Sequence, residues 1–424
     1  MSHINTKCIQ EGYTPKSGEP RVVPIAQSTT FKYDTAQEIA QWFNLSAGGF
    51  AYTRLANPTV AAVAAKLTAL EGGVGGVLTA SGQSASLMSI LNICKSGDHV
   101  VCSASLYGGT YNLFNKTMRD MGIDFTFIHP DESYEKICES FKENTKLVFT
   151  ETLSNPNLVV LDIGKWSRAA HAHGVPHITD NTFPTPINCR PFEHGADIVV
   201  HSTTKYLDGH ACSLGGAIID SGNFDWNAHS DKFPGLTEPE ETYHGLVYTE
   251  NFGKAAYAIK LTAHMLRDLG ATMSPQNAFL LNLGLETLFL RMERHCQNAL
   301  QVAKYLEKHD KVSWVNFPGL ENNPYYKLAN QYMPGGTCGV VAFGVKGGRE
   351  AGVKVMEAMK LAAIVVHVAD ARTCVLHPAS TTHRQLSDQA LADAGIGVDL
   401  LRMSIGIEHA DDIIADIEQA LAQV

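Results

Sequence analysis

The sequence predicts an α/β fold with a mostly parallel, seven-stranded sheet flanked by helices. Between residues 75 and 220, seven short apolar runs rich in β-branched residues are strand-like, and helical stretches separate the first five of them. Strands that alternate with helices in this way are typical of parallel sheets covered on both faces. The 424 residues, 45% apolar and 18% charged, suit a globular protein of more than one domain.

The first 55 residues show no clear period, and we expect residues 1–60 to form an arm. The start lacks the apolar core of a signal peptide, and no uninterrupted apolar stretch approaches membrane-spanning length. The formal net charge of −10 argues against a nucleic-acid or anionic-membrane surface. Nine scattered cysteines without a C-x-x-C pair favour reduced thiols in a cytoplasmic protein, and neither they nor the histidines predict a metal site.

The predicted sheet belongs to a large domain, residues 61–284. Its expected strands are 75–80, 99–104, 123–128, 146–151, 175–180, 197–202 and 215–220. Sheets of this kind place their sites at the carboxyl ends of the strands. Asp180 ends the fifth expected strand and Lys205 follows the sixth, so both are predicted at one edge. On local sequence alone, Lys205 could also simply reach water.

The chain after the sheet divides into a loop, a helix and a smaller domain. Residues 221–250 are polar and irregular, which is long for a passive connection and suggests a functional loop. Residues 284–309 predict one strong amphipathic helix, with Arg291, Glu293 and Arg294 on its solvated face. Further strand-like and helical segments predict a smaller α/β domain over residues 285–424.

A phosphate cradle upstream completes the pattern at the strand ends. Ser81 stands where a helix N-cap belongs, and Gly82 lets backbone N–H groups approach an anion, although Ser81 could serve as a cap alone. The glycine pattern is not a dinucleotide fingerprint, and no P-loop occurs. Pyridoxal phosphate needs a lysine for covalent attachment, a carboxylate for its pyridine nitrogen and an anion site, which Lys205, Asp180 and this helix start could supply.

Three neighbouring side chains could add to such a site. Ser202 and Thr204 flank the lysine and could donate to the same phosphate. Tyr107 follows the second expected strand, where an aromatic ring could stack on the cofactor, although a half-buried core tyrosine is the ordinary alternative.

Eight segments, in this order, resemble the Cys/Met-metabolism enzymes of pyridoxal-phosphate fold type I. They are FAYTRLANPT, ASGQSA, SLYGGTY, ETLSNPN, ITDNTF, HSTTKYLDGH, HPASTTH and LRMSIGIE. The resemblance runs from about residue 10 to the C-terminus. It implies pyridoxal 5′-phosphate as cofactor and a homo-oligomer, a tetramer built as a dimer of catalytic dimers.

The resemblance also implies roles for individual residues. Lys205 and Tyr107 would be catalytic. The cofactor would be held by Lys205, Asp180, Ser81, Gly82, Gln83, Tyr107, Asn155, Ser202 and Thr204, with Tyr52 and Arg54 of the arm completing the phosphate site of the neighbouring subunit. Arg402, Asn155 and His367 would bind the substrate. The local pattern agrees for Arg402, because Leu401 and Met403 alternate toward a core and Arg402 points the other way, although a surface salt bridge is the alternative.

Within the family, the sequence favours sulfhydrylases that act on acylated homoserine. The polar insertion, Gly109 where many methionine γ-lyases carry cysteine, and His367 where several lyases carry serine resemble O-acetylhomoserine sulfhydrylases. We expect γ-replacement, in which O-acetyl-L-homoserine and sulfide, or a thiol or a protein sulfur carrier, give L-homocysteine and acetate for methionine biosynthesis. Methionine γ-lyase and cystathionine γ-synthase or lyase activities are the alternatives. A non-enzymatic scaffold and a nicotinamide-dependent dehydrogenase are weaker alternatives, because the lysine set is intact and the glycine fingerprint is missing.

Overall fold

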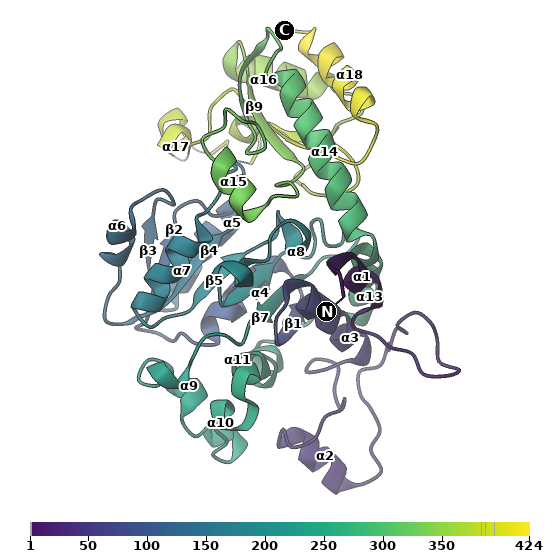
Figure 1. Cartoon of the computed structure of the whole chain (residues 1–424), viewed down its shortest axis with the longest axis vertical. Helices are drawn as coiled ribbons and strands as arrows, with labels where there is room; N and C mark the ends of the chain where they lie inside the picture. The colour runs from purple at the N-terminus through teal and green to yellow at the C-terminus, as the bar shows by residue number, and fades with distance from the viewer. Residues whose placement is uncertain (1, 383, 386, 394) are drawn as a thin grey trace.

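The computed structural model describes residues 2–382, 384–385, 387–393 and 395–424 (Figure 1). Its larger sheet has seven strands in the order β1-β7-β6-β5-β4-β2-β3. Strands β2 to β6 pair in parallel, whereas β7 is antiparallel to both β1 and β6. The strands are β1 (Gly75–Thr79), β2 (His99–Ser103), β3 (Asp124–Ile128), β4 (Thr145–Glu151), β5 (His177–Asp180), β6 (Ile198–His201) and β7 (Gly216–Asp220). The predicted mostly parallel seven-stranded sheet is confirmed.

Helices flank this sheet between and beyond its strands. They are α3 (Pro58–Glu71), α4 (Gly82–Leu91), α5 (Gly108–Asn112), α6 (Tyr134–Cys138), α7 (Ile163–Ala172), α8 (Thr185–Asn188), α9 (Pro234–Thr237), α10 (Tyr248–Phe252), α11 (Ala256–Lys260), α12 (Arg267–Leu269) and α13 (Pro275–Glu286). The central strands β2, β4, β6 and β7 are buried along nearly their whole length. This burial explains why they read as continuous apolar runs rather than as alternating ones.

A second, five-stranded sheet lies beside the upper part of α14 in Figure 1, near the C-terminus. Its order is β10-β11-β12-β9-β8. The strands are β8 (Val312–Asn316), β9 (Val340–Val345), β10 (Ala363–Ile364), β11 (Cys374–Leu376) and β12 (Leu400–Ser404), and the helices are α14 (Leu288–Leu306), α15 (Tyr326–Tyr332), α16 (Gly348–Ala358), α17 (Asp388–Asp393) and α18 (Ala410–Leu421). This sheet has its own apolar cluster, separate from that of the larger sheet.

The single helix predicted over residues 284–309 is wrong in two respects. The structure has two helices, α13 and α14, with the break at Thr287. Arg291 is buried rather than solvated, and its guanidinium donates to the carbonyls of Tyr206 (2.7 Å) and Gly284. Carbonyl groups left free by the helix break and the turn after β6 make this burial possible, because they replace water around the charge.

Residues 221–250 form short helical turns rather than an irregular loop. They include 3-10 turns at Asn227–His229 and Glu241–Tyr243, besides α9. Trp226 and Phe233 are buried there, and the Trp226 ring stacks on Tyr257. Aromatic packing therefore gives the segment a core that its polar composition did not suggest.

The N-terminal segment contains α1 (Ile4–Gln10) and α2 (Ala36–Phe43). Helix α1 packs on α3, α13 and α14 and buries Cys8, whereas α2 stands apart from both sheets in Figure 1. Among the described residues, no helix is both long and apolar enough to cross a membrane. The last residue of the HPASTTH segment, His383, lies outside the described residues.

Candidate active site

Lys205 lies just beyond the carboxyl end of β6. The turn is closed by the Gly209 N–H, which donates to the Lys205 carbonyl at 2.8 Å. The Lys205 Nζ lies 3.3 Å from Nδ1 of His367. Burial, and then the Arg402 guanidinium, lower the pKa of Lys205 to about 8. A lysine in water would keep a pKa near 10.4. The amine is thus poised to be neutral when it must act as a nucleophile or a base.

Two carboxyl groups end neighbouring strands beside this lysine. Asp180 ends β5 and Glu151 ends β4, and they are partners in the parallel register. Burial raises the pKa of both, and the neighbouring Asp180 raises the pKa of Glu151 further. Thr182 donates its backbone N–H (2.9 Å) and its hydroxyl to Asp180, which favours the ionised form. Asp180 therefore ionises more readily than Glu151.

The start of α4 lies against the end of β6. Ser81 is its N-cap, and its hydroxyl accepts the Ser84 N–H at 3.1 Å. A Cβ at Gly82 would lie 2.7 Å from the Ser202 Cβ, so only glycine permits this approach. Helix N–H groups of the first turn have no intrahelical partners, and they attract anions. The Thr204 hydroxyl donates to the Gly215 carbonyl (3.1 Å), so it would have to change partner to donate to a phosphate.

Tyr107 immediately precedes α5, with about half of its surface (51%) exposed. Its backbone N–H donates to the Glu151 carboxyl. The Gln83 side chain accepts the Thr110 hydroxyl at 3.2 Å, which ties α4 to α5. A Cβ at Gly109 would lie 2.5 Å from the Tyr107 ring, so this glycine leaves room for the ring in its present position. The Tyr107 ring is thus free to cover a flat ligand beside the strand ends.

Arg402, in the second sheet, contacts Asn155, which follows β4 of the first sheet. Arg402 lies in β12, with Leu401 and Met403 buried in the second core as the alternation predicted. Its guanidinium donates to the Asn155 side chain (3.1 Å) and to the His367 carbonyl (3.4 Å). The Arg402 Nε is buried without a hydrogen-bond partner in the described part of the chain. A buried, unpaired guanidinium N–H is well suited to receive a carboxylate.

Tyr52 and Arg54 do not join this set within their own chain. The Arg54 guanidinium lies over the Tyr52 ring, 5.2 Å from its centre, and donates to the Arg267 carbonyl. Tyr52 is exposed. The other predicted site residues lie together around the edge of the sheet where β4, β5 and β6 end.

Sequence reasoning assigned no role to Glu151 or Asp370 and left the role of Arg372 open. Glu151 ends its apolar strand as Asp180 does, so its position was a usable signal. Asp370 is buried, lies 3.7 Å from Nε2 of His367 through one oxygen, and accepts the Arg372 guanidinium at 3.1 Å through the other. Only the fold brings this pair toward Lys205. No group of three or more potential metal ligands is found in the described residues.

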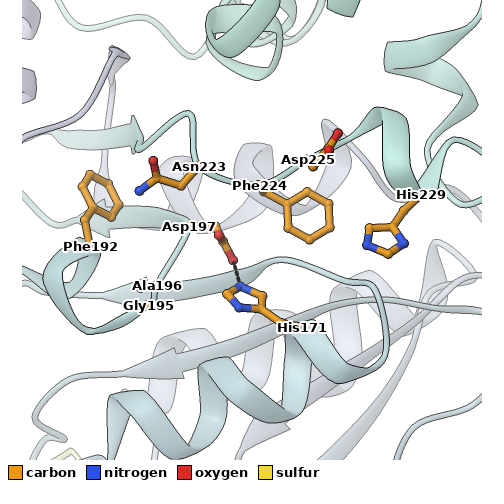
Figure 2. Close-up of a pocket in the computed structure, with 9 residues that line it drawn as sticks. All are labelled: His171, Phe192, Gly195, Ala196, Asp197, Asn223, Phe224, Asp225 and His229. Carbon is orange, nitrogen blue, oxygen red and sulfur yellow. Dashed lines mark hydrogen bonds and ion pairs between the residues drawn. The ribbon is translucent and has the colours of Figure 1, made fainter.

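A cavity of about 240 Å³ lies elsewhere on the larger sheet (Figure 2). It is lined by His171, Phe192, Gly195, Ala196, Asp197, Asn223, Phe224, Asp225 and His229. Asp197 directly precedes β6, so this cavity opens at the strand edge opposite to Lys205. Its volume is below the usual range for ligand pockets, and Asp197 is already held by His171 and by the His177 N–H, both at 2.8 Å. It is therefore distinct from the candidate active site.

The fold and the site define a pyridoxal-phosphate-dependent enzyme of fold type I. The residues fit the cofactor, because a lysine of lowered pKa, an ionisable carboxyl and a helix start cleared by a glycine meet at one sheet edge. The protein-family description "Cys/Met metabolism PLP-dependent enzyme" matches residues 5–422, so the chain belongs to this family.

Individual relatives are similar over nearly the full length. The chain is 45% identical to a homocysteine synthase of Schizosaccharomyces pombe, covering 99% of this chain and 98% of that one. It is 43% identical to an O-acetyl-L-homoserine sulfhydrylase of Leptospira meyeri, covering 95% and 93%. A crystal structure described as an O-acetylhomoserine (thiol)-lyase of Campylobacter jejuni superposes with a TM-score of 0.94 at 36% identity, covering 99% of this chain and all of that one. It carries N′-pyridoxyl-lysine-5′-monophosphate at its position 205.

Proposed function

We propose that this chain is an O-acetylhomoserine aminocarboxypropyltransferase. It would convert O-acetyl-L-homoserine and sulfide into L-homocysteine and acetate by γ-replacement. The observation that carries the proposal is full-length similarity, at 43 to 45% identity, to a homocysteine synthase and an O-acetyl-L-homoserine sulfhydrylase. The reaction belongs to methionine biosynthesis by direct sulfhydrylation. The alternatives, methionine γ-lyase and cystathionine γ-synthase or lyase activity, share the cofactor and differ in their substrates.

The site residues have separable roles in this proposal. Lys205 attaches the cofactor and Asp180 holds a positive charge at its ring nitrogen. Ser81, Gly82, Gln83, Ser202 and Thr204 hold the phosphate, and Tyr107 covers the ring. Arg402, with Asn155 and His367, binds the substrate. Cα and Cγ of the substrate are thereby fixed relative to Lys205.

The chain's own groups move the protons of the reaction. When bound, pyridoxal phosphate supplies an electron sink that makes the Cα–H and then the Cβ–H bonds acidic. Arg402 holds the carboxylate, so that Lys205 Nζ faces Cα, takes its proton and later acts at Cβ. Acetate then leaves from Cγ as the anion, and hydrosulfide adds to the same carbon. The uncharged acetyl ester needs no anion pocket of its own, which favours acetyl over succinyl or phosphoryl as the leaving group.

One assay separates the proposal from its alternatives. The purified protein is given O-acetyl-L-homoserine with and without sulfide, and homocysteine and 2-oxobutyrate are measured. Sulfide-dependent homocysteine formation supports the proposal. Formation of 2-oxobutyrate that does not depend on sulfide would replace it with a γ-lyase. Repeating the assay with a thiol or a sulfur-carrying protein in place of sulfide, and comparing the rates of product formation, tests which sulfur donor the enzyme uses.

We also propose that the active site is shared between two chains. Residues 1–60 would be an arm that carries Tyr52 and Arg54 to the phosphate of the neighbour, with residues 61–284 and 285–424 as the large and C-terminal domains of a cytoplasmic homotetramer. The exposure of Tyr52, and its stacking on Arg54 rather than on a core, support a partner outside the chain. Each catalytic dimer would then exchange arms about a two-fold axis.

Mixing two inactive variants tests this sharing. Lys205→Ala and Arg54→Ala chains are combined after dissociation and reassembled. In a mixed dimer, one site carries both defects and the other carries none, so roughly a quarter of all sites recover when pairing is random. If Arg54 acts in its own chain, every site keeps a defect, and activity remains at the parental level after proven exchange.

A further inference from the structure

His367 occupies an unusual position for a group that only binds substrate. Its Nδ1 lies 3.3 Å from Lys205 Nζ, and its Nε2 lies 3.7 Å from an Asp370 carboxylate oxygen. The other Asp370 oxygen accepts the N–H (2.7 Å) and the guanidinium of Arg372. One oxygen of Asp370 is thus fixed by Arg372, and the other remains for the imidazole. The carboxylate thus contacts the imidazole, and the imidazole contacts the reacting amine.

The backbone of His367 is held from two sides, so this geometry is built rather than accidental. Its carbonyl accepts the Arg402 guanidinium at 3.4 Å and the Cys374 thiol at 3.3 Å. The ring nitrogen Nε2 is buried and makes no hydrogen bond within the described residues. A buried imidazole N–H whose nearest acceptor, the Asp370 carboxylate, lies beyond hydrogen-bond distance at 3.7 Å is costly, which favours a function for this ring over a packing role.

We infer that His367, backed by Asp370, is the second proton site of the reaction and takes from Lys205 the proton that Lys205 has removed from Cα. This inference rests on the proposed γ-replacement, which removes protons from both Cα and Cβ before the Cγ–O bond breaks. One amine can hold one such proton. The Cα proton passes to Lys205 Nζ, then from Nζ to Nδ1 of His367, and the neutral amine takes the Cβ proton. Hydrosulfide replaces acetate at Cγ, and the two protons return to carbon in reverse order, so charge and atoms balance.

The electrostatic surroundings allow the imidazole to begin neutral. Burial and Lys205 lower the pKa of His367, while Asp370 and Asp208 oppose this effect and Arg372 adds to it. The lysine itself faces Arg402, Cys374 and Asp370. At neutral pH the ring therefore carries one proton, which Asp370 favours on Nε2, and leaves Nδ1 free to accept from Lys205. Transfer from Lys205, whose pKa is about 8, to His367, whose pKa is lowered from 6.5, is uphill. Asp370 reduces its cost by stabilising the imidazolium, as carboxylates do in other His–Asp pairs.

The first experiment follows hydrogen exchange in D₂O by NMR, with cofactor-loaded enzyme and L-homoserine, which lacks the acetyl leaving group. His367→Asn keeps an acceptor beside Lys205 but has no basic nitrogen. We expect Cα–H exchange to stay within about threefold, whereas Cβ–H exchange falls about 10²-fold or more, the usual range for a lost acid–base group. Homocysteine formation, measured separately with O-acetyl-L-homoserine and sulfide, should fall by a similar factor. His309→Asn, beside Glu418 and far from the site, is the matched control and should change neither exchange rate.

The second experiment needs neither cofactor nor turnover. Histidine ring NMR of the apo-protein, with His367 assigned by the signal lost in His367→Asn, gives its pKa directly. Lys205→Ala should raise the pKa of His367, because it removes the charge that lowers it, and Asp370→Asn should lower it. The Asp370→Asn variant also serves in the exchange experiment if His367→Asn fails to fold, with the same expected split between Cα and Cβ.

Three results would overturn the inference. Equal loss of Cα–H and Cβ–H exchange in His367→Asn would mean a positioning role, and a raised KM with unchanged kcat would mean that His367 only binds substrate. A His367 pKa that responds to neither Lys205→Ala nor Asp370→Asn would mean that the three groups do not interact. Failure of the γ-replacement proposal looks different, because wild-type enzyme would then exchange Cα–H and Cβ–H without forming homocysteine.

Discussion

Ionisable side chains at the two edges of the larger sheet have different surroundings. At the edge opposite to Lys205, the Asp197 carboxylate is bound by His171 (Figure 2). It also accepts the His177 N–H, so its hydrogen-bonding demand is met within the protein. At the carboxyl edge, burial and Arg402 lower the pKa of Lys205 to about 8, and Arg402 keeps a buried N–H without a partner in the described residues. Both edges contain a histidine beside an aspartate. Unmet polar demand alone does not separate the edges, because an Asp220 oxygen beside Asp197 is also buried without a partner in the described residues. The difference teaches that a lysine of lowered pKa beside a guanidinium with a free N–H, rather than a histidine–aspartate pair, marks the reaction site.

The largest expected effect comes from Lys205→Ala, because the amine both attaches the cofactor and moves protons. Turnover should fall by about 10⁴-fold or more, while the far-ultraviolet circular dichroism spectrum stays that of the folded protein. The variant should lack the yellow absorbance that borohydride bleaches. Borohydride should also no longer attach the cofactor covalently to the chain. Absorbance after borohydride treatment and gel filtration measures this loss.

Lys260 offers a matched control, because burial also lowers its pKa to about 8. Its Nζ donates to the Asn92 carbonyl at 2.8 Å, away from the strand ends. Lys260→Met should keep the yellow absorbance that borohydride bleaches, the covalent attachment of the cofactor after reduction, and the turnover. If Lys205→Ala retained the colour and Lys260→Met lost it, the attachment site would have to move to Lys260.

The next largest effect is expected for Asp180→Asn. The amide cannot balance a positive charge at the cofactor ring, so the rate should fall about 10²- to 10³-fold while cofactor still binds. Steady-state kinetics and absorbance titration with pyridoxal phosphate measure the two quantities. The matched variant Glu151→Gln replaces the carboxyl that ionises less readily and should cost much less. Equal losses in the two variants would show that Asp180 has no special charge role.

Arg402→Lys should have a smaller effect that falls on substrate binding. Lysine keeps the charge but loses the planar, bidentate donor, so kcat/KM should fall by roughly 10- to 100-fold, mainly through KM. Cofactor affinity should stay unchanged. A variant that loses cofactor affinity but keeps its KM would place Arg402 on the cofactor side of the site.

Sequence could predict the strands and the residues that end them, but not the contacts between distant segments. The runs ending at Asp180 and at Ser202 were readable because buried parallel strands are continuously apolar. Arg291 was assigned to solvent because helical periodicity cannot show that carbonyls of Tyr206 and Gly284 surround it. The approach of Asp370 and His367 to Lys205 depends on how the second sheet meets the first, and no local pattern encodes it.

The smallest effect is expected at the opposite edge, for the His171–Asp197 pair. The hydrogen bond from Asp197 raises the pKa of His171 above its usual 6.5. A raised pKa adds stability that is fully present below the unfolded value of 6.5 and is lost as pH rises through the folded value. His171→Gln should therefore lower the free energy of unfolding by about 0.5 kcal/mol near pH 6, a small value because the imidazole is 43% exposed and water screens the pair. The difference should shrink toward zero near pH 8.5, and turnover should be unchanged at both pH values.

Urea unfolding of wild type and variant at the two pH values measures the difference. An equal cost at both would assign the pair to a neutral hydrogen bond, and a loss of turnover would connect the two edges that the structure keeps apart.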